Sequence, residues 1–375
     1  MATQVEGNVG STRHLQYKKL SGDPSRPEIR LLEVRPAQSL HDTVSARIVN
    51  LPLTPDLDFI GVSALYGDTD DTEPIIIDGK RIMVPANLGQ ALRHARAVFW
   101  PLQTGPTTAD PKRTTVDGKG QGQRGMESNR KRPHWLRHLL RTFGLPSSEG
   151  DRSRAQNSTL RIWIDVFCVN ERDEREQKEQ HTLMATAYRH ARTVVGWLGP
   201  KDETSDKAVQ IIRDVDRAVP ANFGTPEDRQ LHPEHYAPHH VWIKDIQYLW
   251  QLPEGVKDLR ECEVWITMSK FLGRQYFQRD WILNEIAMAS FPTFLIGEEI
   301  LSWSEVLRWN RCNEELSDTG AGQFPEEYRT EICSLLPLAT VYTMLKAFER
   351  SKDNRPTDSS SRSVITRCPS SYSSQ

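Results

Sequence analysis

The sequence predicts an α/β fold, in which a mostly parallel sheet is flanked by helices. The prediction comes from three consecutive segments of residues 160–199. Leu160 to Val169 is an apolar run that holds one acid, Asp165, as in strands that are covered on both faces. Apolar residues then recur at helical spacing from Leu183 to Ala191, and Thr193 to Leu198 is a second short apolar run. Strand, helix and strand over about 30 residues make a βαβ crossover, which joins parallel strands.

Length and composition favour one domain with appendages. The 375 residues are enough for two domains, but only 37% are hydrophobic, so we assign the polar excess to tails and an insertion. Ten Trp and eleven Phe supply the large side chains of a core. The formal net charge of -2 predicts no particular partner.

The cysteines and the absence of long apolar runs indicate the compartment. Five cysteines are widely spaced without a CxxC pair, which favours neither a disulfide framework nor a zinc site and suits a reducing compartment. The N-terminus has no apolar signal core, and no stretch approaches the roughly 18 apolar residues of a membrane span. We therefore expect a soluble cytoplasmic protein without membrane contact, and a nuclear location stays open.

The first strands follow a polar arm, residues 1–27, which we expect to be disordered. Strands are predicted at Ile29 to Val34 and at Ser45 to Leu51, which pair with each other. A third apolar run, Phe59 to Leu65, stops at the sequence Tyr-Gly-Asp of residues 66–68. A turn at the end of such a strand lies where open α/β sheets place their ligands.

A hairpin and a helix complete the small N-terminal region. Two apolar runs between Pro74 and Pro85 flank Asp78 and Gly79, a strong signal for a tight hairpin. Asn87 is then expected to cap a helix. One face of this helix is apolar, with Leu88, Ala91, Leu92 and Ala95.

Residues 101–158 differ in composition and are predicted to be a low-complexity basic insertion. They are rich in Pro, Gly, Thr and Ser with a surplus of Lys and Arg, and only Pro133 to Phe143 has the spacing of a short amphipathic helix. The basic residues Arg130, Lys131 and Arg132 leave a nuclear-import or phosphate-binding patch as the alternative.

A helix is predicted at Ser205 to Val219, and a loop rich in Pro and His at Ala221 to His240. Four histidines in this loop suggest a metal, but its prolines break any helix that would align them and no Cys completes a ligand set, so no metal site is predicted. These histidines are His232, His235, His239 and His240.

The remaining elements are read from apolar patterning. They are apolar-patterned segments at Trp242 to Trp250 and Glu263 to Leu272, a helix over 274–290, a strand at Phe294 to Ile296, helices at Ser304 to Asn310 and Glu326 to Arg350, and a disordered Ser-rich tail over 351–375.

Three blocks of residues together resemble the fungal heterokaryon incompatibility (HET) domain. The first runs from Phe59 to Asp68 and keeps Ser63, Gly67 and Asp68, with Phe59, Ala64 and Tyr66 as departures. The second, the most specific, keeps five positions and has Glu171 where the family has Gln. The third has Asn284 in place of Gln. The kept residues of the second and third blocks are Trp163, Ile164, Asp165, Cys168 and Asn170, then Arg279, Trp281 and Glu285.

The resemblance implies a HET domain over residues 28–300 and a C-terminal helical extension over 301–350. HET domains are distantly similar to Toll/interleukin-receptor (TIR) domains, which have a flavodoxin-like sheet. Some TIR domains cleave NAD with one glutamate on a helix. The resemblance thus implies a role in fungal non-self recognition and programmed cell death, with Glu285 as the catalytic residue, Trp281 beside it and NAD as a substrate rather than a cofactor.

The residues themselves leave each site assignment open. Ser63, Gly67 and Asp68 end a strand and suit a nucleotide, because Gly permits close approach and Asp accepts ribose hydroxyls, yet a tight turn capped by Asp68 explains them as well. Asp165 either points into the same cleft or is a buried acid satisfied by local donors. Glu285 either faces the ligand or pairs with an arginine on its helix surface. We expect Cys168 to be a packing residue.

Two functions therefore compete. One is NAD cleavage, and the other is a non-enzymatic signalling module that associates with itself or with an incompatibility partner protein. A third, nucleic-acid binding through residues 101–158, has weaker motivation, so nucleic acid is not expected as a partner.

Overall fold

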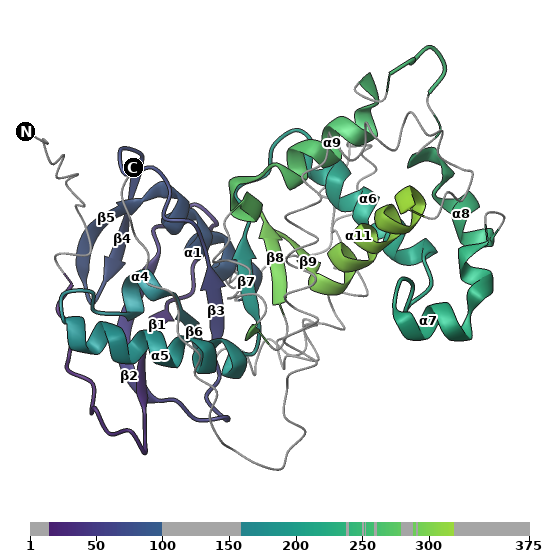
Figure 1. Ribbon diagram of the computed structural model, residues 1–375. Coiled ribbons are helices and arrows are strands. Elements are labelled where there is room, and N and C mark those ends of the chain that lie inside the picture. The colour runs from purple at the N-terminus through teal and green to yellow at the C-terminus, as the bar shows by residue number, and fades with distance from the viewer. Residues whose placement is uncertain are drawn as a thin grey trace, which may run out of the picture.

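A mixed nine-stranded sheet runs through the computed structural model of the protein (Figure 1). The structure describes residues 15–99, 159–237, 240–249, 251, 253–258, 261–278, 288–289 and 292–318. Within them the strand order is β5-β4-β2-β1-β6-β3-β7-β8-β9. The strands are β1 (Glu28–Val34), β2 (Ser45–Pro52), β3 (Ile60–Ser63), β4 (Thr72–Ile77), β5 (Lys80–Pro85), β6 (Leu160–Trp163), β7 (Val194–Trp197), β8 (Pro292–Ile296) and β9 (Glu299–Ser302).

The α/β class is confirmed, but the sheet is less parallel than predicted. The pairs β2/β4, β3/β6, β3/β7 and β7/β8 are parallel, whereas β1/β2, β1/β6, β4/β5 and β8/β9 are antiparallel. Short connections join β1 to β2, β4 to β5 and β8 to β9, and strands joined by short turns pair antiparallel. The parallel part is therefore the central group β6-β3-β7-β8.

The predicted early strands and hairpin are confirmed. Strand β1 pairs with β2 along its whole length, from Glu28 opposite Pro52 to Val34 opposite Ala46. In the hairpin β4-β5, Asp78 and Gly79 have φ of 50° and 77°. Two positive φ values at the turn match the type I′ geometry that an Asp-Gly pair favours.

The predicted crossover over residues 160–199 is confirmed with shifted boundaries. It comprises β6, the short helix α4 (Asp165–Cys168), the helix α5 (Glu174–His190) and β7, and β3 lies between its two parallel strands. The first strand ends at Trp163, earlier than predicted, because the chain turns into α4 at Asp165. Helix α5 begins at Glu174, ahead of the apolar spacing from Leu183 that predicted it, since the Asp173 carboxylate accepts hydrogen bonds from the amides of Arg175 and Glu176.

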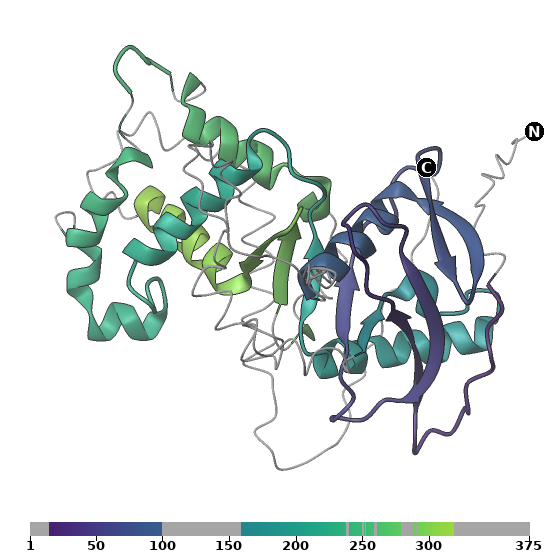
Figure 2. The same cartoon turned by 180° about the vertical axis from the view of Figure 1, so that it is seen from behind.

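Helices α5 and α1 (Ala86–Phe99) cover opposite faces of the central strands (Figures 1 and 2). Tyr188 of α5 meets Trp163 edge to face, and Gly61 leaves the space that the Tyr188 ring occupies. On the other face, His94 of α1 stacks on Trp197, with ring centroids 5.0 Å apart. The apolar face predicted for α1 is confirmed, because all four of its residues are buried.

The remaining described helices gather beyond β8 and β9 (Figure 1). They are α6 (Ser205–Ala218), α7 (Pro226–Leu231), η3 (Pro233–Tyr236), α8 (Val241–Asp245), η4 (Gln247–Leu249), α9 (Glu263–Leu272), η6 (Gln275–Gln278) and α11 (Trp303–Asp318). Helix α6 confirms its prediction, and the apolar-patterned segment Glu263 to Leu272 forms α9. None of the described helices is both long and apolar enough to span a membrane.

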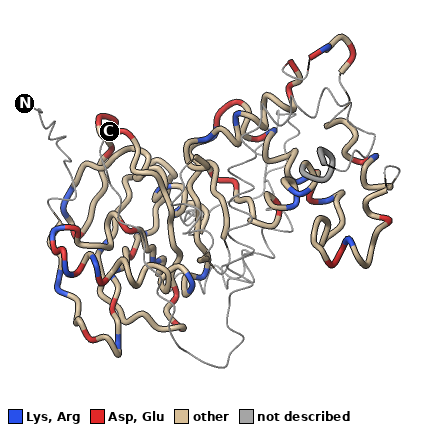
Figure 3. The backbone as a smooth tube through the Cα atoms, in the orientation of Figure 1, with Lys and Arg blue, Asp and Glu red and all other residues tan. Residues whose placement is uncertain are grey.

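Lys and Arg alternate with Asp and Glu along α5 (Figure 3).

Three predictions for this region are corrected. The segment Ala221 to His240 is largely helical, because Thr225 caps α7 and Pro233 starts the 3-10 helix η3. Strand β9 was not predicted, and it returns from β8 through Gly297. Helix α11 starts as predicted but extends beyond Asn310 to Asp318. Ser302 and Glu305 form a capping box at its start, in which each side chain binds the backbone amide of the other.

Several predictions lie outside the described residues. These are most of the N-terminal arm, the insertion over 101–158, the middle of the helix expected over 274–290, the helix Glu326 to Arg350 and the tail. Of the arm, residues 15–27 are described, and Leu15 and Leu20 are buried.

A buried ion pair joins the sheet to α5. Arg30 of β1 is 0% exposed and makes two contacts with the carboxylate of Glu176, one of them 2.9 Å long. Arg30 also donates to the carbonyl of Lys18 at 2.8 Å, and Tyr17 covers its guanidinium at 4.8 Å. Glu176 in turn accepts from the Asn170 amide at 3.2 Å. The pair thus connects four segments of the chain.

We expect Glu176→Gln to lower the free energy of unfolding by about 3–5 kcal/mol, because it leaves the buried guanidinium of Arg30 without a counter-charge. The matched control is Glu179→Gln on the same helix, which breaks only the exposed pair with Arg175 and should cost less than about 0.5 kcal/mol. Urea unfolding of the full chain measures both values. Equal losses would contradict the role given to the buried pair.

His94 predicts a pH dependence of stability. Burial lowers its pKa from 6.5 to about 4, so the folded protein keeps the ring neutral where the unfolded chain protonates it. The contribution is fully present above pH 6.5 and is lost as the pH falls from 6.5 to about 4. At pH 4 this loss lowers the free energy of unfolding by at most about 3 kcal/mol.

In His94→Phe, which keeps an aromatic ring against Trp197, the free energy of unfolding should therefore fall less between pH 7 and pH 4 than in the wild type. Thermal and urea unfolding across this pH range measure the difference, with the exposed His181 changed to Gln as the control. Parallel pH profiles for wild type and His94→Phe would exclude this source of acid sensitivity.

Candidate functional site

The candidate site is the edge of the sheet at the carboxyl ends of β3, β6 and β7. In chain order the central parallel strands are β3, β6, β7 and β8, and in space they lie as β6-β3-β7-β8. Among these strands, the chain continues from β3 to its neighbour β6, whereas from β7 it continues to its neighbour β8 in the opposite direction along the sheet. Open α/β sheets form a crevice at such a switch point, outside the carboxyl ends of the strands. The loops after β3 and β7 border this position.

Ser63 ends β3, but its hydroxyl is not open to solvent. It is 2% exposed and accepts a hydrogen bond from the Tyr276 hydroxyl at 2.9 Å. Gly196 lies opposite Ser63 on β7 and makes room for this tyrosine, since a Cβ there would lie 2.5 Å from the Tyr276 oxygen. Ser63 therefore holds the strand end to η6. Tyr276 was missed by sequence reasoning, although a Gly within an apolar strand signals a close approach.

Gly67 allows the loop after β3 to pass close to α1. Its φ is +87°, and a Cβ would lie 2.7 Å from the Asn87 Cβ. Asn87 was predicted to cap α1, but the helix already starts at Ala86, and the Asn87 side chain makes hydrogen bonds outside the helix instead. Its amide nitrogen donates to the Leu65 carbonyl at 2.6 Å, and its oxygen accepts from the Trp197 indole at 3.0 Å. Asn87 thereby joins the loop after β3 to the end of β7.

Asp68 lies exposed on the same loop. One of its carboxylate oxygens accepts a hydrogen bond from the Asp70 amide at 2.9 Å, as in the turn alternative weighed from sequence. The residue is nevertheless open to solvent at the strand end. A carboxylate in this place can accept hydrogen bonds from a bound hydroxyl group.

Asp165 lies at the carboxyl end of the neighbouring strand β6. It is partly buried, and its carboxylate accepts from the Val166 amide at 2.8 Å. Desolvation raises the pKa of Asp165, and the negative charge of Glu171 adds to the effect. The pKa of Tyr66 is raised by the same two causes in the same order. Asp165 and Tyr66 thus share one electrostatic environment with Glu171, at the ends of β6 and β3.

Cys168 is a packing residue, as predicted. It is 1% exposed, and burial raises the pKa of its thiol to about 12. A thiol with so high a pKa is protonated at neutral pH and is a poor nucleophile.

The structure therefore brings Ser63, Gly67 and Asp68 onto one strand end and places Asp165 at the end of the adjacent strand. Glu285 and Trp281 lie outside the described residues. At this edge the accessible groups are carboxylates, a phenol and loop backbone. Such groups can bind the hydroxyls of a sugar or nucleotide.

Comparison with known proteins relates part of this chain to a known family. The model of the heterokaryon incompatibility protein (HET) family matches residues 150–285, which include the crossover. Heterokaryon incompatibility protein 6, OR allele, of Neurospora crassa is 25% identical over 311 residues, which cover 80% of this chain and 38% of that protein. This chain thus spans well under half of that relative's length, and no solved structure matches it significantly. Residues 150–285 of this chain are thus similar to the heterokaryon incompatibility (HET) family.

Proposed function

We propose that this chain acts in fungal non-self recognition and cell death by cleaving NAD at the bond between nicotinamide and ribose. In this reaction the C1′–N bond breaks and the nitrogen keeps the electron pair. Water then forms a C1′–O bond and loses a proton, so the products are nicotinamide and ADP-ribose. The name of the relative supports the biological setting, and the sheet supports the chemistry.

The observation that carries the proposal is the order of the parallel strands. Numbered along the chain, β3, β6, β7 and β8 lie in the spatial order 2-1-3-4. This is the order of the first four strands of flavodoxin-like sheets, which bind a nucleotide cofactor at the switch point between strands 1 and 3. Here that point lies between β3 and β7. We infer a TIR-like relationship from the same order.

The residues at this edge have suitable chemistry for NAD. Gly67 and Asp68 are both exposed on the loop after β3, and the Asp68 carboxylate can accept hydrogen bonds from ribose hydroxyls. Cleavage develops positive charge on the ribose, which a carboxylate stabilises. By the family resemblance this carboxylate belongs to Glu285. Because nicotinamide is already a good leaving group, no second acid is required.

A non-enzymatic signalling module is the second candidate, and the packing of the shared motif favours it. Ser63 binds Tyr276, Trp163 contacts Tyr188, and Cys168 of α4 is buried against β1. These contacts give the motif residues a structural reason to be present. In this alternative the domain acts through self-association or through a partner protein.

The decisive experiment measures NAD consumption by the full chain at high protein concentration. We expect the wild type to release nicotinamide and Glu285→Gln to lose at least about 100-fold in rate, because the carboxylate charge is removed while the side-chain shape is kept. Glu203→Gln, at an exposed position near α6, is the control and should keep wild-type activity.

Two results would reject catalysis. One is a wild type that leaves NAD intact under conditions where sedimentation shows it to be assembled, which would favour the signalling module. The other is equal turnover by the wild type and Glu285→Gln, which would remove Glu285 from the mechanism.

A further inference from the structure

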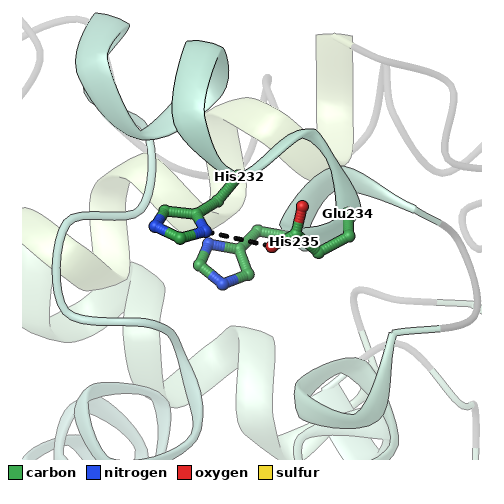
Figure 4. Close-up of side chains that lie close together, drawn as sticks. All are labelled: His232, Glu234 and His235. Atoms are coloured by element: carbon green, nitrogen blue, oxygen red, sulfur yellow. Dashed lines mark hydrogen bonds and ion pairs between the residues drawn. The ribbon is translucent and has the colours of Figure 1, made fainter.

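A cluster of metal-binding side chains lies between α7 and η3, far along the chain from the sheet edge (Figure 4). His232, Glu234 and His235 each place one ligand atom within 4.8 Å of the others. The Nδ1 atom of His232 is 3.0 Å from a carboxylate oxygen of Glu234. The rings of His232 and His235 are stacked, with centroids 4.8 Å apart. Two imidazoles and a carboxylate therefore share one small space.

The backbone brings these side chains together by two consecutive turns. Helix α7 ends at Leu231, and the His232 amide still donates to the Asp228 carbonyl at 2.7 Å. Pro233 then starts η3, and the His235 amide donates to the His232 carbonyl at 3.0 Å. In a 3-10 turn, residues three apart lie on the same side. The prolines that argue against a helix thus align His232 with His235.

A buried carboxylate supports the cluster from inside the protein. Asp228 is 4% exposed, and its oxygens lie 3.1 and 3.3 Å from the Nδ1 of His235. It also accepts from the Tyr236 hydroxyl at 2.8 Å, so its position is fixed. A histidine that binds a metal usually has such a carboxylate partner, which sets the ring orientation. The edge of the His240 ring packs against His235 at 5.4 Å.

We propose that His232, Glu234 and His235 bind a divalent transition-metal ion, with Asp228 positioning His235. Imidazole nitrogens and a carboxylate oxygen are the donors that Zn²⁺ accepts in proteins. Tetrahedral Zn²⁺ with bonds near 2.0–2.1 Å separates its ligand atoms by roughly 3.3 Å, and the 3.0 Å between His232 and Glu234 is close to this value. The ion would stabilise the turn that leads from α7 into η3.

The competing explanation is an ordinary surface ion pair. The side chains of His232 and Glu234 are 51% and 58% exposed, and exposed pairs contribute little to stability. An ion pair explains the contact between these two residues, but it does not require His235 or the buried Asp228. Exposure also leaves open coordination positions for water. A metal titration separates the two explanations.

The experiment is a titration of the metal-free full chain with Zn²⁺ in competition with a chromophoric chelator. We expect the wild type to bind Zn²⁺ and to unfold at a higher temperature when the ion is present. His232→Ala and Glu234→Gln should each weaken binding by at least about tenfold and abolish the thermal shift. Both residues are exposed, so these variants should keep the wild-type circular dichroism in the absence of metal.

His41→Ala is the matched control, because it removes an exposed histidine outside the cluster. It should bind Zn²⁺ as the wild type does. The proposal fails if the wild type does not bind Zn²⁺, or if His232→Ala and Glu234→Gln bind it as tightly as His41→Ala does. Asp228→Asn adds a graded test, with an affinity between those of the control and the ligand variants.

Discussion

The arrangement of the sheet and its helices depends on the buried pair of Arg30 and Glu176. The buried arginine needs acceptors for its charge. The terminal nitrogens of Arg30 donate to a carboxylate and two carbonyls, whereas its Nε has no partner among the described residues. The carboxylate comes from α5, and the carbonyls from Cys168 and Lys18. Because these partners belong to separate segments, the pair fixes α5 and the end of α4 against β1. The position of Asp165 at the end of β6 follows from this.

The sheet edge is held by a second set of polar contacts. Asn87 joins the loop after β3 to Trp197, and Tyr276 joins the end of β3 to the space above Gly196. Tyr276 is buried, and both polar atoms of the Asn87 side chain are engaged in these hydrogen bonds. Asn87 and Tyr276 fix the two strand ends between which the chain changes direction. A rigid edge with Gly67 and Asp68 on its outer side is the basis for proposing a nucleotide there.

Local signals in the sequence predicted the elements well. The hairpin at Asp78 and Gly79 depends on two residues that tolerate positive φ, and the apolar face of α1 depends on helical spacing. Both are properties of short segments, and both are confirmed. The crossover was predicted for the same reason, because its apolar runs and its charged helix lie next to one another in sequence.

Long-range partners could not be predicted in this way. Asn87 has the sequence context of a helix cap, but its partners lie 22 and 110 residues away. The sheet is mixed because β1 and β9 pair antiparallel with the outer strands of the central group, β6 and β8. No local sequence pattern indicates this pairing. Sequence reasoning treats the prolines near His232 as residues that break a helix, although proline also starts helical turns, as Pro233 does in η3. Of the candidate site, sequence identified the strand-end residues but not the groups that hold them.

Hydrogen–deuterium exchange of the full chain with and without NAD tests most directly whether the edge between β3 and β7 binds a nucleotide. Exchange should slow in the loops over residues 64–70 and 198–204, which follow β3 and β7, when NAD is added, while the hairpin over 72–85 stays unchanged. Unchanged exchange in both loops at saturating NAD, or protection confined to other segments, would contradict the account.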